Sequence, residues 1–438
     1  MDRQRVTFAA LLAILPFAPD LPAQEVIDLA GRDRPLDADF EEIFRVGVRE
    51  GEDWEMFANA SSVAFDADGN LYVVDGLYYG MDTRIVVFDA SGNFVREFGS
   101  MGEGPGEFNM PTAVAVMRDG TTVVEDLRHR AYQLFDANGG FMRMVRKRGG
   151  IAYHDLFADP RGGGVFAKRE EGASITITSS AGGAAPPPAP STSRPLWRVD
   201  LGGEEARNDT VVEGWLAPRG EVPDLPGPPR EAKGPTYEPP FLVGVLPDGS
   251  VVHSDSSAYE LKITAADRGG AARVIRRPLR PRPVTRDMEE AYNGIVSNTA
   301  SVENPATGER ASYELPKRVF YPEVSLLLAL STTWEGRIWV QRRGEEAANP
   351  RTAAPVDPDR LRELPPGRYE LPPVGPVDWR TPGPIDVVTA DGRYIGTFAT
   401  EATALPDAFG PGGMAAFIEL DEFDVASVVV RRLPAAVR

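Results

Sequence analysis

The sequence predicts an all-β fold, and three observations support this prediction. The chain has 438 residues, of which 42% are hydrophobic, so it is long and apolar enough for a sizeable buried core. It contains 44 Gly and 40 Pro, a composition that favours frequent turns over long helices. Alternating apolar runs also flank tight glycine turns many times along the chain, as in SSVAFDADGNLYVVD at residues 61–75. These features together indicate many short strands.

Two kinds of repeat alternate along the chain, and each predicts a β-hairpin. The first kind is an apolar strand, an Asp-Gly-like turn and a second apolar strand, with turn glycines Gly69, Gly120, Gly163, Gly249 and Gly336. The second kind has the same form and begins at Ile85, Tyr132 and Ile385, with weaker copies at Leu196 and Glu260. One hairpin of each kind makes a four-stranded unit, which is typical of a propeller blade.

A sixth blade and the closure of the ring are predicted from the two ends of the chain. Residues 414–433 suggest the sixth blade, with Asp421 and Glu422 in its turn, but no later strand follows before Arg438. Residues 40–47, FEEIFRVG, precede the first blade and are apolar enough to supply the missing outermost strand. We therefore predict an all-β six-bladed β-propeller that is closed by exchange between N- and C-terminal strands, which removes two exposed sheet edges.

The best-defined repeat resembles the NHL-repeat family of six-bladed β-propellers, and more closely the exported bacterial propellers related to it. Residues 102–140 carry the resemblance: GEGPGEFNMPTAVAV is followed by VVEDLRHRAYQLFD. This order matches the family's glycine turn, Phe, Pro, apolar strand, Asp, Arg, second apolar strand and Phe-Asp. The resemblance implies a fold and leaves the activity open, because this fold hosts enzymes, ligand binders and scaffolds.

The N-terminus predicts export from the cytoplasm. Residues 1–23 combine two arginines, an apolar run from Val6 to Ala18 and small or polar residues after it, which is the outline of a signal peptide. Residues 24–438 then form the propeller, in the periplasm or outside the cell. The chain has no Cys, so it is indifferent to an oxidising compartment.

Four insertions interrupt the repeats. Three are rich in proline and small residues and are expected as loops on one rim, at residues 180–195, 216–240 and 344–384. The fourth, residues 285–298, is the one helical candidate, with Thr285 as its N-cap. Met288, Ala291, Tyr292 and Ile295 share one face of this helix, which we expect to pack on the propeller; a lid over the channel mouth is the other interpretation.

Histidines and carboxylates are the candidate residues for chemistry. His129, His154 and His253 fall in three different blades, and enzymes that resemble the amidating lyase hold an axial metal with such histidines. A lactonase-like propeller would use carboxylates, and Asp75, Glu125, Asp126 and Asp255 follow the second strands of their blades. The resemblance implies a structural role for these carboxylates instead, paired with turn amides and with Arg84, Arg128 or Arg130.

Nucleophilic catalysis has no candidate constellation, because the chain lacks Cys and a Gly-x-Ser-x-Gly motif. Trp54, Trp215, Trp334 and Trp339 are expected in the core, with Trp339 between blades. No catalytic or metal-binding residue is assigned.

The function expected from these observations is a non-catalytic binding scaffold that uses one rim and needs no cofactor. The contacts assigned are aromatic residues of the insertions, namely Tyr292, Tyr369 and Trp379, with Tyr237 also on this variable surface. A net charge of −18 disfavours nucleic acid, so the partner is expected to be a protein, peptide or neutral glycan, bound by a monomer that does not span a membrane. The alternative is a metal-dependent hydrolase or lyase on the same propeller, lactonase-like or amidating-lyase-like, which would hold Ca²⁺ or Zn²⁺.

Overall fold

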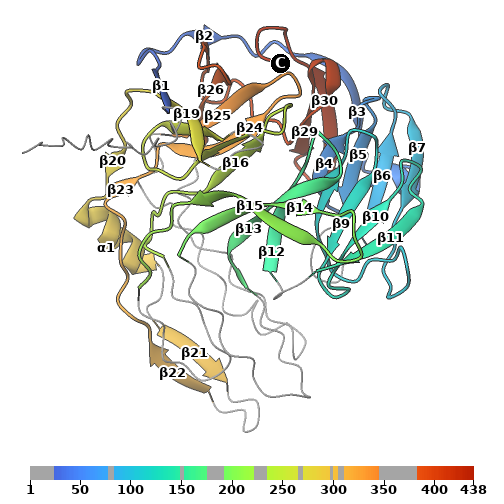
Figure 1. The fold of residues 1–438 in the computed structure, drawn as a ribbon, viewed down its shortest axis with the longest axis horizontal. Helices are drawn as coiled ribbons and strands as arrows, with labels where there is room; N and C mark the ends of the chain where they lie inside the picture. Colours follow the sequence, from blue (N-terminus) through green and yellow to red (C-terminus); the bar gives the residue numbers. More distant parts are fainter. Residues whose placement is uncertain are drawn as a thin grey trace, which may run out of the picture.

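Six sheets form a ring in the computed structural model of the chain, and successive sheets are the blades of a propeller (Figure 1). The structure describes residues 24–76, 83–147, 152–174, 192–220, 234–264, 270–295, 299–303, 310–344 and 382–438. The predicted signal peptide at residues 1–23 lies outside these ranges. The predicted all-β six-bladed propeller is confirmed.

The first three blades are four-stranded antiparallel meanders, each built from two consecutive hairpins. Their strands, given from the inner to the outer edge, are β4 (Ala60–Phe65), β5 (Leu71–Asp75), β6 (Arg84–Phe88) and β7 (Phe94–Phe98) in blade one; β8 (Pro111–Val116), β9 (Thr122–Asp126), β10 (Ala131–Phe135) and β11 (Phe141–Arg146) in blade two; β12 (Ala152–Ala158), β13 (Gly164–Ser174), β14 (Arg194–Asp200) and β15 (Arg207–Gly214) in blade three.

The last three blades have the same order of strands, and each gains a strand from the N-terminal segment. Their strands are β16 (Leu242–Val245), β17 (Val251–Ser254), β18 (Glu260–Thr264), β19 (Ala271–Arg276) and β1 (Glu25–Asp28) in blade four; β24 (Leu327–Thr332), β25 (Arg337–Arg343), β26 (Pro382–Thr389), β27 (Tyr394–Phe398) and β2 (Pro35–Leu36) in blade five; β28 (Ala408–Phe409), β29 (Met414–Leu420), β30 (Ala426–Arg432) and β3 (Glu41–Val46) in blade six.

Aspartates at the start of the hairpin turns explain the repeated Phe-Asp pairs. In four turns, one Asp oxygen accepts hydrogen bonds from the amides two and four residues later, at 2.8–3.0 Å, as at Asp66, Asp89, Asp136 and Asp421. Gly69 follows in such a turn with a φ of 81°, in the left-handed region that glycine adopts without steric cost. The register of each hairpin is therefore set by a few local residues.

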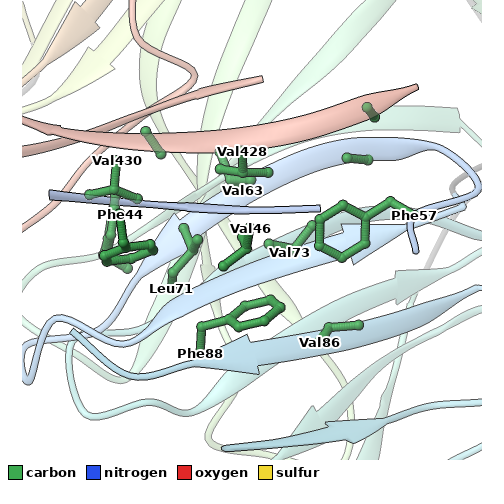
Figure 2. Packing of buried hydrophobic residues seen from close by; sticks show 14 of the residues in the cluster. Phe44, Val46, Phe57, Val63, Leu71, Val73, Val86, Phe88, Val428 and Val430 are labelled. Atoms are coloured by element: carbon green, nitrogen blue, oxygen red, sulfur yellow. The ribbon is translucent and has the colours of Figure 1, made fainter. Parts of the chain in front are cut away.

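The predicted closure is confirmed by β3, which pairs antiparallel with β30 at the outer edge of blade six (Figure 1). Phe44 and Val46 of β3 then pack with Leu71 and Val73 of blade one (Figure 2). The same cluster includes Val428 and Val430 of β30. The chain ends are thus joined by both a backbone ladder and a buried apolar core.

Two further strands of the N-terminal segment were not predicted. β1 pairs in parallel with β19 of blade four, and β2 pairs in parallel with β27 of blade five. Together with β3, they make residues 25–46 a strap that crosses three successive blades, and we call this segment the N-terminal strap.

The sixth blade differs from the predicted pattern in one respect. Residues 414–433 form its second and third strands, β29 and β30, and the innermost strand is the two-residue β28 before them. Its hairpin lacks glycine because Asp424 takes the left-handed conformation, with a φ of 61°. Asp421 and Glu422 lie in this turn, as predicted.

The insertion between blades four and five contains the helix and two small sheets. Helix α1 spans Arg286–Ile295, and its Met288 amide donates a 3.4 Å hydrogen bond to the Thr285 hydroxyl, which confirms the N-cap. The accompanying strand pairs are β20 (Arg282–Pro283) with β23 (Glu323–Val324), and β21 (Thr299–Glu303) with β22 (Arg310–Glu314). Within the described ranges, no helix is long and apolar enough to span a membrane.

Candidate binding rim

Strand direction divides the connections of the ring between two rims. Because successive strands of a blade are antiparallel, the first-to-second and third-to-fourth turns share one rim. The second-to-third turns and the connections between blades share the other. Short glycine turns such as those at Gly69, Gly92 and Gly120 occupy the first, which we call the turn rim.

The long insertions all belong to the second rim, which we call the insertion rim. The connection from β15 to β16 and the one from β19 to β24, which contains α1, both lie there (Figure 1). The strand ends that flank residues 175–191 and 345–381 lie there as well, although those residues are outside the described ranges. The strand ends that flank these insertions therefore all lie on one side of the ring.

Carboxylates at the ends of second strands anchor the insertion rim. Asp75, Asp126 and Asp255 are all buried, and each accepts a backbone amide hydrogen bond from the connection that enters its blade. The donors are the amides of Asn59 at 2.7 Å, Asn109 at 2.6 Å and Trp215 at 2.7 Å, respectively. These repeated carboxylates hold one inter-blade connection each, whereas the resemblance implied amides of the turn as their backbone partners.

The side-chain partners of these carboxylates differ between blades. Asp75 pairs with Arg84 at 3.2 Å, as predicted. Asp126 contacts His129 Nδ1 at 3.0 Å and accepts a 3.2 Å hydrogen bond from Gln133. The predicted partner Arg128 is instead exposed, and its amide bonds to the Asn109 carbonyl.

Glu125, the residue before Asp126, is a second buried carboxylate of blade two. It forms an ion pair with Lys147, and it accepts a 3.2 Å hydrogen bond from the Thr112 hydroxyl. The nearby Tyr132 phenol is desolvated by burial and lies beside the charge of Glu125, so its pKa is raised. Glu125 is thus enclosed within the blade by its partners.

The three histidines do not form one described cluster. His129 is held by Asp126 and lies 3.3 Å from the Glu103 carbonyl. His253 is buried between blades three and four, where desolvation lowers its pKa to about 4, and its Nδ1 has no hydrogen-bond partner among the residues that the structure describes. The side chain of His154 is not described. Where side chains are described, no group of three His, Asp or Glu residues is placed to hold a metal ion.

A small aromatic core supports the insertion rim beside blade four. Tyr237, Met288, Tyr292 and Val324 form it, and all four are at least nine-tenths buried. Met288 and Tyr292, which were expected to pack on the propeller, pack instead in this core of insertion residues. Tyr292 therefore contacts Tyr237 rather than solvent, with ring centroids 6.1 Å apart. Tyr369 and Trp379, the other two assigned contacts, lie outside the described residues.

The prediction that Trp215 lies in the core is wrong, because 41% of its surface is exposed. Its ring meets Tyr321 edge to face, with centroids 5.8 Å apart, and Val319 lies two residues earlier with 56% of its surface exposed. We call Trp215, Val319 and Tyr321 the aromatic ledge.

The main chain beneath the aromatic ledge is fixed by buried polar groups. The Trp215 amide donates to Asp255, and the Trp215 carbonyl accepts a 2.6 Å hydrogen bond from Arg194 Nε. The Tyr321 amide donates to the Thr236 carbonyl at 2.8 Å, which joins the two insertions. Gly214 permits the close approach, since a Cβ there would lie 2.7 Å from the Phe241 ring.

The aromatic ledge therefore presents the exposed ring of Trp215, beside the half-buried ring of Tyr321, on an ordered backbone. Such rings lose little conformational freedom on binding, and aromatic residues dominate the energetics of many interfaces. The sequence carries one signal of this exposure: Trp215 follows Gly214, after the last alternating strand position and directly before the second proline-rich tract.

Comparison with known sequences agrees with this architecture. The DUF5128 family model, described as a 6-bladed beta-propeller, matches residues 53–142, from the approach to blade one to the start of the outermost strand of blade two. No curated protein sequence matches the chain. The sheets and the family model together define a six-bladed β-propeller protein, while the NHL assignment stays a prediction.

Solved structures of other proteins match over nearly the whole chain at low identity. A Bacteroides fragilis protein described as exported has 10% identity and a TM-score of 0.46, covering 93% of this chain and 99% of its own. A duf4221 family member from Bacteroides vulgatus has 11% identity and a TM-score of 0.46, covering 90% and 98%. Virginiamycin B lyase from Staphylococcus aureus has 10% identity and a TM-score of 0.37, covering 89% and 99%. Similarity at this level carries no argument about function.

Proposed function

We propose that the chain is an exported, non-catalytic binding scaffold that captures a protein, peptide or neutral glycan on its insertion rim. The aromatic ledge is the observation that carries this proposal. Trp215 is exposed although its own amide and carbonyl are both held by buried side chains, which is the arrangement of a pre-ordered contact.

The charge of the chain supports this class of partner. A net charge of −18 repels polyanions, whereas aromatic rings stack on the apolar faces of sugars and on peptide side chains. Export belongs to the same proposal, and it requires that residues 1–23 be absent from the protein recovered outside the cytoplasm. Intact-mass analysis of that protein tests this part.

The aromatic ledge is tested by replacing Trp215 with alanine. We expect Trp215→Ala to weaken capture of the partner by about tenfold or more, because a central aromatic contact contributes on the order of 2 kcal/mol. The partner is recovered with tagged protein from the periplasmic or medium fraction of the native organism and then titrated. Since the Trp215 side chain is partly exposed, the variant should keep the melting temperature of the parent within a few degrees.

Met142→Ala is the matched control. Met142 is also exposed, at 54%, but it lies at the outer edge of blade two, away from the insertion rim. We expect this variant to retain full capture. A second arm replaces Tyr369 and Trp379 together, which tests the third insertion. Equal capture by Trp215→Ala, the double variant and the parent would contradict the insertion rim as the contact surface.

A further inference from the structure

A pocket of about 410 Å³ lies where blades five and six meet, far along the ring from the aromatic ledge. The N-terminal strap contributes Ala38 and Phe40, the connection between the blades contributes Ala404 and Asp407, and blade six contributes Phe417 and Arg431. We call these residues and the space between them the seam pocket. Its volume falls within the range of roughly 300–1,000 Å³ that is typical of small-molecule sites.

The apolar side of the seam pocket is anchored in the core between the blades. Phe417 is buried, and Phe40 packs edge to face on Phe398 with ring centroids 5.6 Å apart. The methyl groups of Ala38 and Ala404 complete this side. Because these groups belong to the strap, to the connection between blades five and six and to blade six, the pocket forms only when the strap is in place.

On the wall of the seam pocket, the charges of Glu419 and Arg431 are already paired within the protein. Glu419 accepts hydrogen bonds from Arg431 at 2.6 Å and from Arg45 at 2.9 Å. Despite the partial burial of Glu419, which acts in the opposite direction, these two arginines lower the pKa of its carboxyl. The guanidinium of Arg431 also lies 4.8 Å from the centroid of the Phe417 ring. Neither Glu419 nor Arg431 therefore needs a ligand charge.

Asp407 is different because no cation balances it. Its Oδ2 accepts a 2.7 Å hydrogen bond from the Ile418 amide, and among the described residues it has no ion pair. Asp407 is an exposed residue at the mouth of the pocket, where water solvates its carboxylate. Partial burial against the pocket wall raises its pKa, although the amide hydrogen bonds oppose the rise. A ligand cation beside this carboxylate would therefore displace no protein partner.

We propose that the seam pocket binds an alkylammonium group, with the ammonium on Asp407 and the alkyl chain against Phe40, Phe417 and Ala404. The group is either a free organic amine or a lysine side chain of a peptide. Both present the same cation on the same apolar stem. This site is separate from the aromatic ledge, which lies beside blades three and four, and it adds a second ligand to the scaffold.

The test titrates the full-length mature protein with n-butylammonium and follows binding by ligand-observed NMR. We expect saturable binding with a Kd of about 1 mM or tighter, and binding of the neutral isostere n-butanol at least about tenfold weaker. Asp407→Asn keeps the shape of the site and removes its charge, so it should lose about tenfold in affinity. Ala404→Leu fills the pocket without a change of charge and should lose as much.

Glu401→Gln is the matched control, since it removes an exposed negative charge from the same connection without touching the pocket. It should bind n-butylammonium like the parent. N-acetyl-lysine methylamide distinguishes the two sources: tighter binding than n-butylammonium identifies lysine, and weaker binding identifies a free amine. The proposal is overturned if the parent shows no saturable binding, or if Asp407→Asn, folded by its melting curve, binds as well as Glu401→Gln.

Discussion

At the scale of single residues, buried charges define where the blades are held together. Asp75, Asp126 and Asp255 occupy equivalent places, and each receives an amide from the connection that enters its blade. Their second partners differ, being Arg84, His129 with Gln133, and Lys262. The shared part of the interaction is therefore the backbone amide, because the repeat fixes the main chain more strictly than the side chains around it.

His253 makes the stability of the ring depend on pH. Burial lowers its pKa from 6.5 to about 4, against the opposing charge of Asp255 and with the help of Lys262. The unfolded chain therefore takes up this proton more readily than the folded chain between pH 6.5 and about 4. The contribution of neutral His253 to stability is present above pH 6.5 and is lost as the pH falls through this window.

We expect this group to lower the free energy of unfolding by about 2 kcal/mol between pH 7 and pH 5. Urea denaturation of the parent and of His253→Met at both pH values measures this difference. The variant has no group that titrates at this position, so its loss between the two pH values should be smaller by that amount. Parallel losses in the two proteins would contradict the assignment.

At the scale of elements, the N-terminal strap is the least expected part of the structure. It covers the outer edges of blades four and five with β1 and β2 before β3 completes blade six. Between β1 and β2, the carbonyl of Ala30 accepts a 2.9 Å hydrogen bond from Arg277, and Asp33 pairs with the same guanidinium at 2.7 Å. Polar contacts thus fasten the strap where its strands end.

The Arg277 guanidinium, which pairs with Asp33 of the strap, also pairs with a carboxylate of blade five. The Arg277 side chain is fully buried and contacts the equally buried Asp386 at 2.8 Å. Asp33 is 45% exposed and also pairs with Arg342. Despite its partial burial, which acts in the opposite direction, hydrogen bonds from Arg342 and Arg277 lower the pKa of Asp33. Asp386, which is buried, should therefore stabilise the Arg277 charge more than Asp33, which is partly exposed.

Substitution of each carboxylate should show this inequality. Asp386→Asn leaves the buried Arg277 charge without its enclosed partner and should destabilise the ring by about 3–5 kcal/mol. Asp33→Asn removes a partly solvated partner and should cost about 1 kcal/mol or less. Urea unfolding of both variants measures the two losses. Equal effects would contradict this inequality and would show that the strap and blade five balance Arg277 to the same extent.

Local patterns predicted the hairpins, and long-range contacts explain what was missed. An Asp followed by a left-handed glycine sets a turn within five residues, so the repeats around Gly69 and Gly120 could be predicted from the sequence. β1 and β2 are four and two residues long and pair with strands more than 200 residues away, which no local pattern encodes. Trp215 was misplaced for the same reason, since its neighbour Tyr321 lies more than 100 residues away.

At the scale of the whole molecule, the ring has two unlike faces. The turn rim consists of short turns in which the amide of a left-handed Gly donates a hydrogen bond to the Asp carbonyl, as at Asp66 and Gly69. The insertion rim carries α1, the aromatic ledge and the connections that three buried aspartates hold in place. Variable surface on a rigid frame is where binding function is usually found.

Hydrogen–deuterium exchange of the mature protein, with and without its captured partner, tests most directly whether the insertion rim is the contact surface. We expect slower exchange in the complex at residues 213–220, 234–240, 286–295 and 317–326, with the turn-rim hairpins at 66–70, 117–121 and 389–393 unchanged. Protection confined to the turn rim or to the outer edges of the blades would contradict this assignment of the contact surface.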